Sequence, residues 1–385
     1  MYMLHTALFL LLSGELFSYA QTAAPLPVPP EAQAATETVK VQISTSAIKA
    51  LILAEKRVRG IHLTSWGAGS DNSRKELIRK ISGSVINTVV IAVKETDGRV
   101  YIPGVEKAHK YGSYLGAISE PEAMMKDFKG AGLYTVARIV TFKDKVLPKV
   151  RPDLAVKTPA GVPWRSRNGS TWLDPYSREV WDYTLDIAEQ CAKLGFEEIQ
   201  FDYIRYPSEG NTSLCRYSKP NNRKAAINNL AEFLAYAAKR LAPYKVKISA
   251  DVFGLTTTVK DDMGIGQDIN VLAAGSDYIY PMMYPSHYAP GEYHIKNPNG
   301  SPFKVINRGL KDAMAKLGPD YAKLRPYLQD FSLGWNYGPS EVRAQLMATR
   351  LNLLESWVLW NPANRYTWAA LTPQSYRAFV DPEYK

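Results

Sequence analysis

Three aspartates lie at the ends of strand-like segments and could act together as catalytic carboxylates. Asp202 lies in FDYIRYP, Asp251 in SADVFG and Asp330 at the end of PYLQD. A carboxylate among apolar strand residues is costly to bury unless it is paired or hydrogen-bonded, and three of them are harder to explain as structural than one. Cleavage of a glycosidic bond needs two carboxyl groups, one protonated as the acid and one ionised as the nucleophile or base. The three aspartates therefore predict glycosidase chemistry.

The residues beside each aspartate suggest how these roles divide. Arg205 follows Asp202 and would help to keep its carboxylate charged, so Asp202 is the candidate nucleophile or base. An ion pair that only fixes the loop is the alternative. Asp251 precedes an apolar Val-Phe pair, which favours a protonated carboxyl and the role of acid. Hydrogen bonds from backbone amides or from Arg205 would instead make Asp251 structural, and Asp330 would orient sugar hydroxyls.

Polar and aromatic side chains near the same strand ends are candidates for binding a sugar. Sugar rings stack on aromatic faces, so a polysaccharide cleft is commonly lined by them, although a single aromatic residue is more often part of the packing. The predicted substrate contacts are Glu95, Arg205, Tyr206, Tyr284, His287, Trp66, Trp172, Trp335 and Trp360.

The elements that would position these residues alternate between strand and helix eight times. Strands are expected over 58–66, 85–93, 134–142, 198–204, 246–253, 277–283, 326–331 and 357–360. Helices are expected over 72–82, 120–131, 178–194, 224–241, 268–274, 305–317 and 340–354. Eight such units favour a closed (β/α)8 TIM barrel, whose active site lies at the C-terminal ends of the strands. The competing doubly wound sheet lacks support, because no G-x-G-x-x-G loop follows the first strand.

The first 56 residues have the composition of a targeting segment and a linker. Residues 1–20 read as a signal peptide, with the apolar run Ala7–Leu12 and small residues before Gln21. The run is shorter than the roughly 20 residues of a membrane span, so no stable span is expected after cleavage; an uncleaved anchor is the alternative. Residues 21–56 form a Pro/Ala-rich linker with a short helix, and 57–385 form the barrel. Export to the periplasm or the exterior is expected.

Composition and missing motifs narrow the function further. The net charge of +10 is spread along the chain, and no basic run or nucleic-acid motif accompanies it, so no nucleic-acid partner is expected. The sequence has no H-E-x-x-H motif and no Cys/His cluster, which predicts no metal and no cofactor. A disulfide between Cys191 and Cys215 is conceivable, and two separate thiols are the alternative. The oligomeric state is open.

The strand-end motifs resemble those of a bacterial family of glycosyl-hydrolase-like barrels, the domain of unknown function 4015. The resemblance covers Val58 to Trp368 and rests on VRGIHLTSW, KETDG, FDYIRYP, SADVFG and PMMYPSHY in that order. It implies a TIM barrel related to α-amylase-like and other retaining glycosidases. Their nucleophile is an Asp at strand four, their acid a Glu at strand five and their helper an Asp at strand seven. Asp202, Asp251 and Asp330 occupy similar places, with a shorter Asp where the family of amylases has Glu.

These observations favour a glycoside hydrolase that cleaves or remodels an envelope or extracellular polysaccharide, with retention of configuration. The alternative is a barrel that binds a glycan without cleaving it, or that acts as a scaffold in the envelope. The distance between the carboxyl groups of Asp202 and Asp251 distinguishes retention from inversion.

Overall fold

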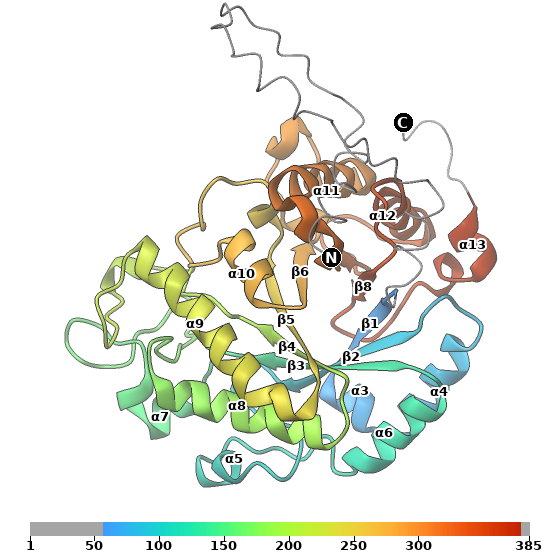
Figure 1. Ribbon diagram of the computed structural model, residues 1–385. Coiled ribbons are helices and arrows are strands. Elements are labelled where there is room, and N and C mark those ends of the chain that lie inside the picture. The colour runs from blue at the N-terminus through green and yellow to red at the C-terminus, as the bar shows by residue number, and fades with distance from the viewer. Residues whose placement is uncertain (1–56, 379–385) are drawn as a thin grey trace, which may run out of the picture. The chain divides into compact units, whose positions relative to one another are not determined.

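The computed structural model describes residues 57–378, and these residues form a closed barrel of eight parallel strands (Figure 1). Each strand pairs with the next along the chain, and β8 pairs with β1. This confirms the predicted (β/α)8 TIM barrel. The expected signal peptide, linker and short helix lie outside the described residues. The strands are β1 Arg59–Leu63, β2 Thr88–Lys94, β3 Tyr134–Val140, β4 Glu198–Asp202, β5 Lys247–Phe253, β6 Tyr278–Met283, β7 Tyr327–Gln329 and β8 Trp357–Trp360.

Helices cover the outer face of the barrel (Figure 1). They are α3 Ser65–Gly69, α4 Asp71–Ile81, α5 Glu106–Lys110, α6 Pro121–Gly130, α7 Leu147–Val150, α8 Arg178–Lys193, α9 Arg223–Leu241, α10 Ile269–Gly275, α11 Pro302–Leu317, α12 Pro339–Leu351 and α13 Pro373–Arg377. The seven predicted helices correspond to α4, α6 and α8 to α12. The short helices α3, α5, α7 and α13 were not predicted, because four or five residues are too few to show a helical period.

The beginnings of two of the three longest helices, α8 and α9, follow from their capping residues. Ser177 caps α8 by accepting a hydrogen bond from the backbone of Val180, and Asn222 caps α9 by accepting one from Ala225. Such side chains satisfy backbone N–H groups that the first turn of a helix leaves without a partner. Within residues 57–378, no helix is long and apolar enough to cross a membrane.

The two cysteines of the barrel do not form a disulfide. Cys191 lies on α8 with its side chain fully buried, and Cys215 lies in the loop after β4 with 8% of its surface exposed. Both are free thiols. Burial raises the pKa of the Cys191 thiol, so this sulfur remains protonated and unreactive at neutral pH.

The interior of the barrel is filled by polar as well as apolar side chains. At the lower end of the barrel, where the strands begin, Glu198 of β4 accepts hydrogen bonds from Arg325 at 2.7 Å, Tyr134 at 3.0 Å and Tyr280 at 2.8 Å. The Arg325 and Glu198 side chains are 3% and 0% exposed. Because the charges are opposite and the tyrosines occupy the remaining acceptor positions, this buried pair is neutral and well satisfied.

Further polar side chains of β4 point into the barrel along the strand, as far as its C-terminal end. Side chains alternate between the two faces of a strand, so Glu198, Gln200 and Asp202 of β4 all point inward. Gln200 accepts a hydrogen bond of 2.8 Å from the Tyr327 hydroxyl in the middle of the barrel. Asp202 therefore ends a column of inward polar residues, and its position follows from the register of β4.

We predict that breaking the buried pair at the lower end destabilises the barrel strongly. Arg325→Met removes the charge that compensates Glu198, and loss of one partner of a buried ion pair costs about 3–5 kcal/mol. The matched control is Arg308→Met on α11, whose partner Asp312 lies at 2.9 Å in an exposed pair; such pairs contribute under about 1 kcal/mol. Urea denaturation gives both free energies of unfolding. Equal losses in the two variants would contradict the prediction.

Candidate active site

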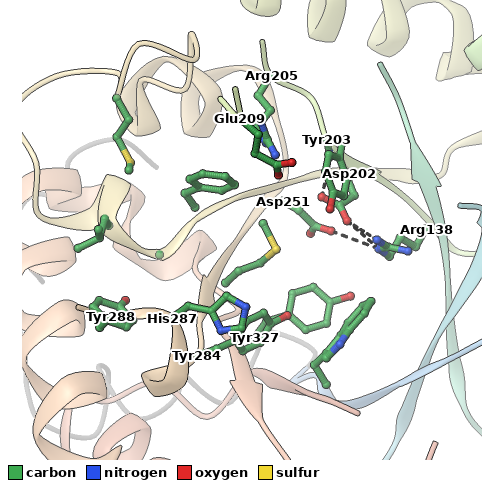
Figure 2. A pocket seen from close by; sticks show the side chains of 16 residues that line it. Arg138, Asp202, Tyr203, Arg205, Glu209, Asp251, Tyr284, His287, Tyr288 and Tyr327 are labelled. Carbon is green, nitrogen blue, oxygen red and sulfur yellow. Dashed lines mark hydrogen bonds and ion pairs between the residues drawn. The ribbon is translucent and has the colours of Figure 1, made fainter. Parts of the chain in front are cut away.

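A pocket of about 440 Å³ opens at the C-terminal ends of the barrel strands (Figure 2). Six residues predicted from the sequence lie in its wall: Asp202, Arg205, Asp251, Tyr284, His287 and Trp360. Ten further residues complete the lining: Arg138, Tyr203, Glu209, Phe253, Gly254, Leu255, Met263, Met282, Tyr288 and Tyr327. The pocket combines two buried carboxyl groups with aromatic walls, the composition of a small-molecule or sugar site.

A buried arginine holds the carboxyl group of Asp202 in place. Arg138 of β3 donates to Asp202 Oδ2 through Nε at 2.9 Å and through Nη2, and these two side chains are 4% and 3% exposed (Figure 2). The other oxygen of Asp202 accepts a hydrogen bond of 2.6 Å from the Tyr203 backbone. Two donors to one carboxylate oxygen and one to the other fix the orientation of the group.

Arg138 connects the site to a second carboxylate and to an aromatic ring. Its Nη1 donates to Glu95 Oε1 at 3.0 Å, and its guanidinium lies 5.0 Å from the ring centre of Trp360. Burial by itself lowers the pKa of Arg138, but the charges of Glu95 and Asp202 outweigh it and leave the pKa well above the ordinary value. The guanidinium is therefore a permanent positive charge in the floor of the pocket.

Asp251 lies in a different environment from Asp202. Its side chain is 1% exposed, and neither carboxyl oxygen has a hydrogen-bond partner among residues 57–378. Its Oδ2 lies 3.9 Å from Arg138 Nε, beyond hydrogen-bonding distance. Burial, and then the negative charge of Asp202, raise the pKa of Asp251 well above its usual value, although Arg138 acts in the opposite direction. Burial and the neighbouring charge thus both favour the protonated form of Asp251.

The pairing of the strands explains why the two carboxyl groups are close. In the β4–β5 pair Phe201 is opposite Ala250, so Asp202 and Asp251 each follow a paired residue on neighbouring parallel strands. Asp202 Oδ2 lies 2.9 Å and Asp251 Oδ2 3.9 Å from the same Arg138 nitrogen. The two oxygens are therefore no more than about 7 Å apart, within the separations used by glycosidases.

The third predicted aspartate lies outside this pocket wall. Asp330 accepts hydrogen bonds from the backbone and the hydroxyl of Thr367 at 2.8 Å and 2.6 Å. Its own backbone carbonyl accepts from the side chain of Asn361. Burial raises the pKa of Asp330, while the bonds from Thr367 act against this shift. Asp330 thus joins β7 to the loop after β8, and its carboxylate oxygens point at the protein rather than at the pocket.

Five of the predicted substrate contacts also lie outside the pocket wall. Glu95 accepts a hydrogen bond from Arg138, as described above, and is not part of the pocket wall. Tyr206 is buried, and its hydroxyl oxygen accepts a hydrogen bond of 3.1 Å from the side-chain amide of Asn229. Trp172 is buried next to the ring of Tyr203. Trp66 is 60% exposed on α3, and Trp335 is 44% exposed in a separate shallow hollow after β7.

The residue that sequence reasoning missed is Arg138, although the sequence contained a sign of it. It stands in the middle of YTVARIV, where every residue of the strand is buried. A charge in such a segment needs a buried counter-charge. Tyr203 was missed for another reason: its φ of 49° is unusual for a tyrosine, and such backbone strain is visible only in three dimensions.

The sequence of residues 60–366 matches the family described as "Putative glycosyl hydrolase domain", the domain of unknown function 4015. The chain belongs to this glycosyl hydrolase family. A comparison with curated protein sequences finds no match. Among solved structures, the chain is similar to the glycoside hydrolase domain of PgaB (BpsB) from Bordetella bronchiseptica, with 13% identity, a TM-score of 0.64, and coverage of 83% of this chain and 97% of that domain.

Two further structural neighbours of this family member have the same fold. Alpha-L-fucosidase isoenzyme 2 from Paenibacillus thiaminolyticus has a TM-score of 0.55 at 12% identity, covering 83% of this chain and 49% of that one. An α-galactosidase from Thermus thermophilus has a TM-score of 0.53 at 11% identity, covering 87% and 69%. At these identities the likeness extends to the barrel fold, and the site must be argued from the residues of this chain.

We predict that the stability of this glycosyl hydrolase domain depends on pH through Asp251. Its raised pKa means that the folded protein binds this proton more tightly than the unfolded chain, so the folded state loses stability as the pH rises above about 4. Asparagine does not titrate. The free energy of unfolding of Asp251→Asn relative to the wild type should therefore increase between about pH 4 and pH 8. Urea denaturation of both proteins at the two pH values measures this difference in the free energy of unfolding. A difference that does not change with pH would contradict the prediction.

Proposed function

We propose that the protein is a glycoside hydrolase in which Asp251 is the general acid and Asp202 the nucleophile of a retaining mechanism. One observation carries this assignment: two adjacent buried carboxyl groups lie in one pocket in opposite environments. Asp202 is ion-paired with Arg138, whereas both oxygens of Asp251 are without a hydrogen-bond partner among residues 57–378. Neighbouring carboxyl groups whose pKa values are driven apart are the usual basis of glycosidase acid and base roles.

The proposed reaction has two steps. Asp251 donates its proton to the glycosidic oxygen as the bond from that oxygen to the anomeric carbon breaks, and Asp202 attacks this carbon to form a glycosyl ester. In the second step Asp251, now ionised, takes a proton from a water molecule, which attacks the anomeric carbon and releases Asp202. Arg138 stays bound to Asp202 throughout and disperses the charge that returns to it.

The separation of the two carboxyl groups supports retention. Their facing oxygens are no more than about 7 Å apart, and retaining enzymes use about 5–5.5 Å whereas inverting enzymes need about 6.5–9.5 Å to admit a water molecule. The upper bound includes the retaining separation and overlaps only the lower end of the inverting range. Retention is therefore the outcome that we expect.

A polysaccharide of the cell envelope or the exterior is the proposed substrate class. The aromatic rings of Tyr203, Phe253, Tyr288 and Trp360 in the pocket wall support sugar binding. The apolar run and small residues of the first 20 positions support export. Both observations are consistent with the proposed substrate class.

We predict that Asp202→Asn and Asp251→Asn each lower kcat at least about a hundredfold, since a positioned acid alone contributes about 10²–10⁴. The measurement is reducing-end release from a panel of envelope and plant polysaccharides. Asp320→Asn is the control, because this half-exposed aspartate pairs with Lys323 in a surface turn. NMR of the first product anomer reports the stereochemistry.

The alternative barrel that binds a glycan without cleaving it gives a different result in the same experiment. In that case no polysaccharide is cleaved by the wild type, while glycan binding persists in both aspartate variants. If the product anomer is inverted, both aspartates remain catalytic residues, but Asp202 acts as the base that activates a water molecule instead of as the nucleophile.

A further inference from the structure

Arg205 is a buried cation in the pocket wall that has no carboxylate partner. It is 2% exposed, and its Nη1 donates to the Tyr206 carbonyl and the Ser208 hydroxyl, both at 3.0 Å. Among residues 57–378, no carboxylate oxygen lies within ion-pair distance of its guanidinium. The other buried arginines of the barrel interior, Arg138 and Arg325, each contact a carboxylate directly. Arg205 is therefore the exception that needs an explanation.

The surroundings of Arg205 hold its guanidinium rigidly. Its central carbon lies 4.5 Å from the ring centre of Phe253, 4.8 Å from that of Trp172 and 4.9 Å from that of Tyr203. Aromatic faces stabilise a cation without neutralising its charge. Burial lowers the pKa of Arg205, and nearby negative charges act against this shift. The arrangement leaves a fixed planar cation at the edge of the pocket.

A second cation strengthens the positive charge of this wall. Lys143 Nζ lies 5.0 Å from the ring centre of Tyr203, the ring that Arg205 also contacts. Its only acidic neighbour at ion-pair distance within residues 57–378 is Glu209, at 3.8 Å. Figure 2 shows Arg205, Tyr203 and Glu209 together on the Asp202 side of the pocket. Two cations thus lie near Glu209, which is half-exposed, and near Asp202, whose oxygens already accept hydrogen bonds from Arg138 and from the Tyr203 backbone.

We propose that Arg205 binds an anionic substituent, a carboxylate or an ester sulfate, on the sugar held beside Asp202 and Asp251. This proposal deepens the proposed function, because it makes an acidic polysaccharide the substrate. A buried cation without a counter-charge is costly, and a ligand anion in the pocket would compensate it. The planar guanidinium suits two parallel hydrogen bonds to such a group.

The test compares binding of matched oligosaccharides to the full chain carrying Asp251→Asn, so that no ligand is consumed. The ligands are oligogalacturonides with carboxylates, carrageenan oligosaccharides with ester sulfates, and neutral cello-oligosaccharides, titrated by calorimetry. We expect one acidic class to bind at least about tenfold more tightly than the neutral one. Arg205→Gln should remove this preference, so that acidic and neutral ligands bind this variant equally. The acidic class that binds identifies the source of the anion.

Three additional variants separate the charge effect from loss of folding. Arg205→Lys keeps the charge without the planar fork and should retain part of the preference. Glu209→Gln removes the acidic neighbour and should strengthen binding of the acidic ligand, opposite in sign to Arg205→Gln. Arg165→Gln is the control, because this exposed arginine lies outside the pocket wall. Melting temperatures of all variants report their folding.

Other outcomes would overturn the proposal in ways that separate it from the proposed function. Equal binding of acidic and neutral ligands by the starting protein overturns the anionic site whatever the variants do. If the wild type cleaves a neutral glycan and Arg205→Gln weakens all ligands equally, the hydrolase remains and the anionic site fails. If acidic ligands bind through Arg205 but the wild type cleaves none, the anionic site remains and the hydrolase fails.

Discussion

The ion pair between Arg138 and Asp202 is the interaction on which the site depends. It joins β3 to β4 inside the barrel and fixes the orientation of one carboxyl group. Its charge also limits the cost of burying Asp251 next to Asp202, since the guanidinium lies between the two. Without it, two carboxyl groups at this separation would repel each other in a medium of low dielectric constant. The difference between the proposed acid and the proposed nucleophile thus follows from their different distances to one arginine, because Arg138 Nε lies 2.9 Å from Asp202 Oδ2 and 3.9 Å from Asp251 Oδ2.

The polar interior of the barrel makes this arrangement possible. Many TIM barrels are filled with layers of branched apolar side chains, but here Glu198 and Arg325 form a neutral pair below, and Gln200 and Tyr327 are hydrogen-bonded above them. The charged groups of the site therefore continue a column of inward polar side chains. Apolar packing is concentrated instead between the strands and the helices, where the large hydrophobic cluster lies. The stability of the barrel and the chemistry of the pocket are thus served by different layers.

The wall of the pocket also contains a buried arginine, but this arginine differs from the two in the barrel interior. Arg138 and Arg325 are compensated by the protein itself, whereas Arg205 is surrounded by aromatic rings and by neutral hydrogen-bond acceptors. A folded protein retains such an uncompensated charge where binding a ligand supplies the compensation. The acid, the nucleophile and the cation of the wall all come from β4, β5 and the loop that follows β4. The reacting bond and the group that identifies the substrate would therefore be held by one rigid part of the barrel.

The sequence by itself determined the barrel and the two central aspartates. Alternation of apolar strands and amphipathic helices is a local pattern, and the eight expected strands all appear with boundaries shifted by a few residues. Asp202 and Asp251 could be found because catalytic residues of this fold lie at strand ends. Only the tertiary structure showed the different environments from which their proposed roles are inferred. Which oxygen is paired with Arg138, which carboxyl is left without a partner, and which aspartate is turned toward Thr367 all depend on contacts between residues distant in the chain. No local pattern specifies such contacts, because they arise from the register and closure of the sheet.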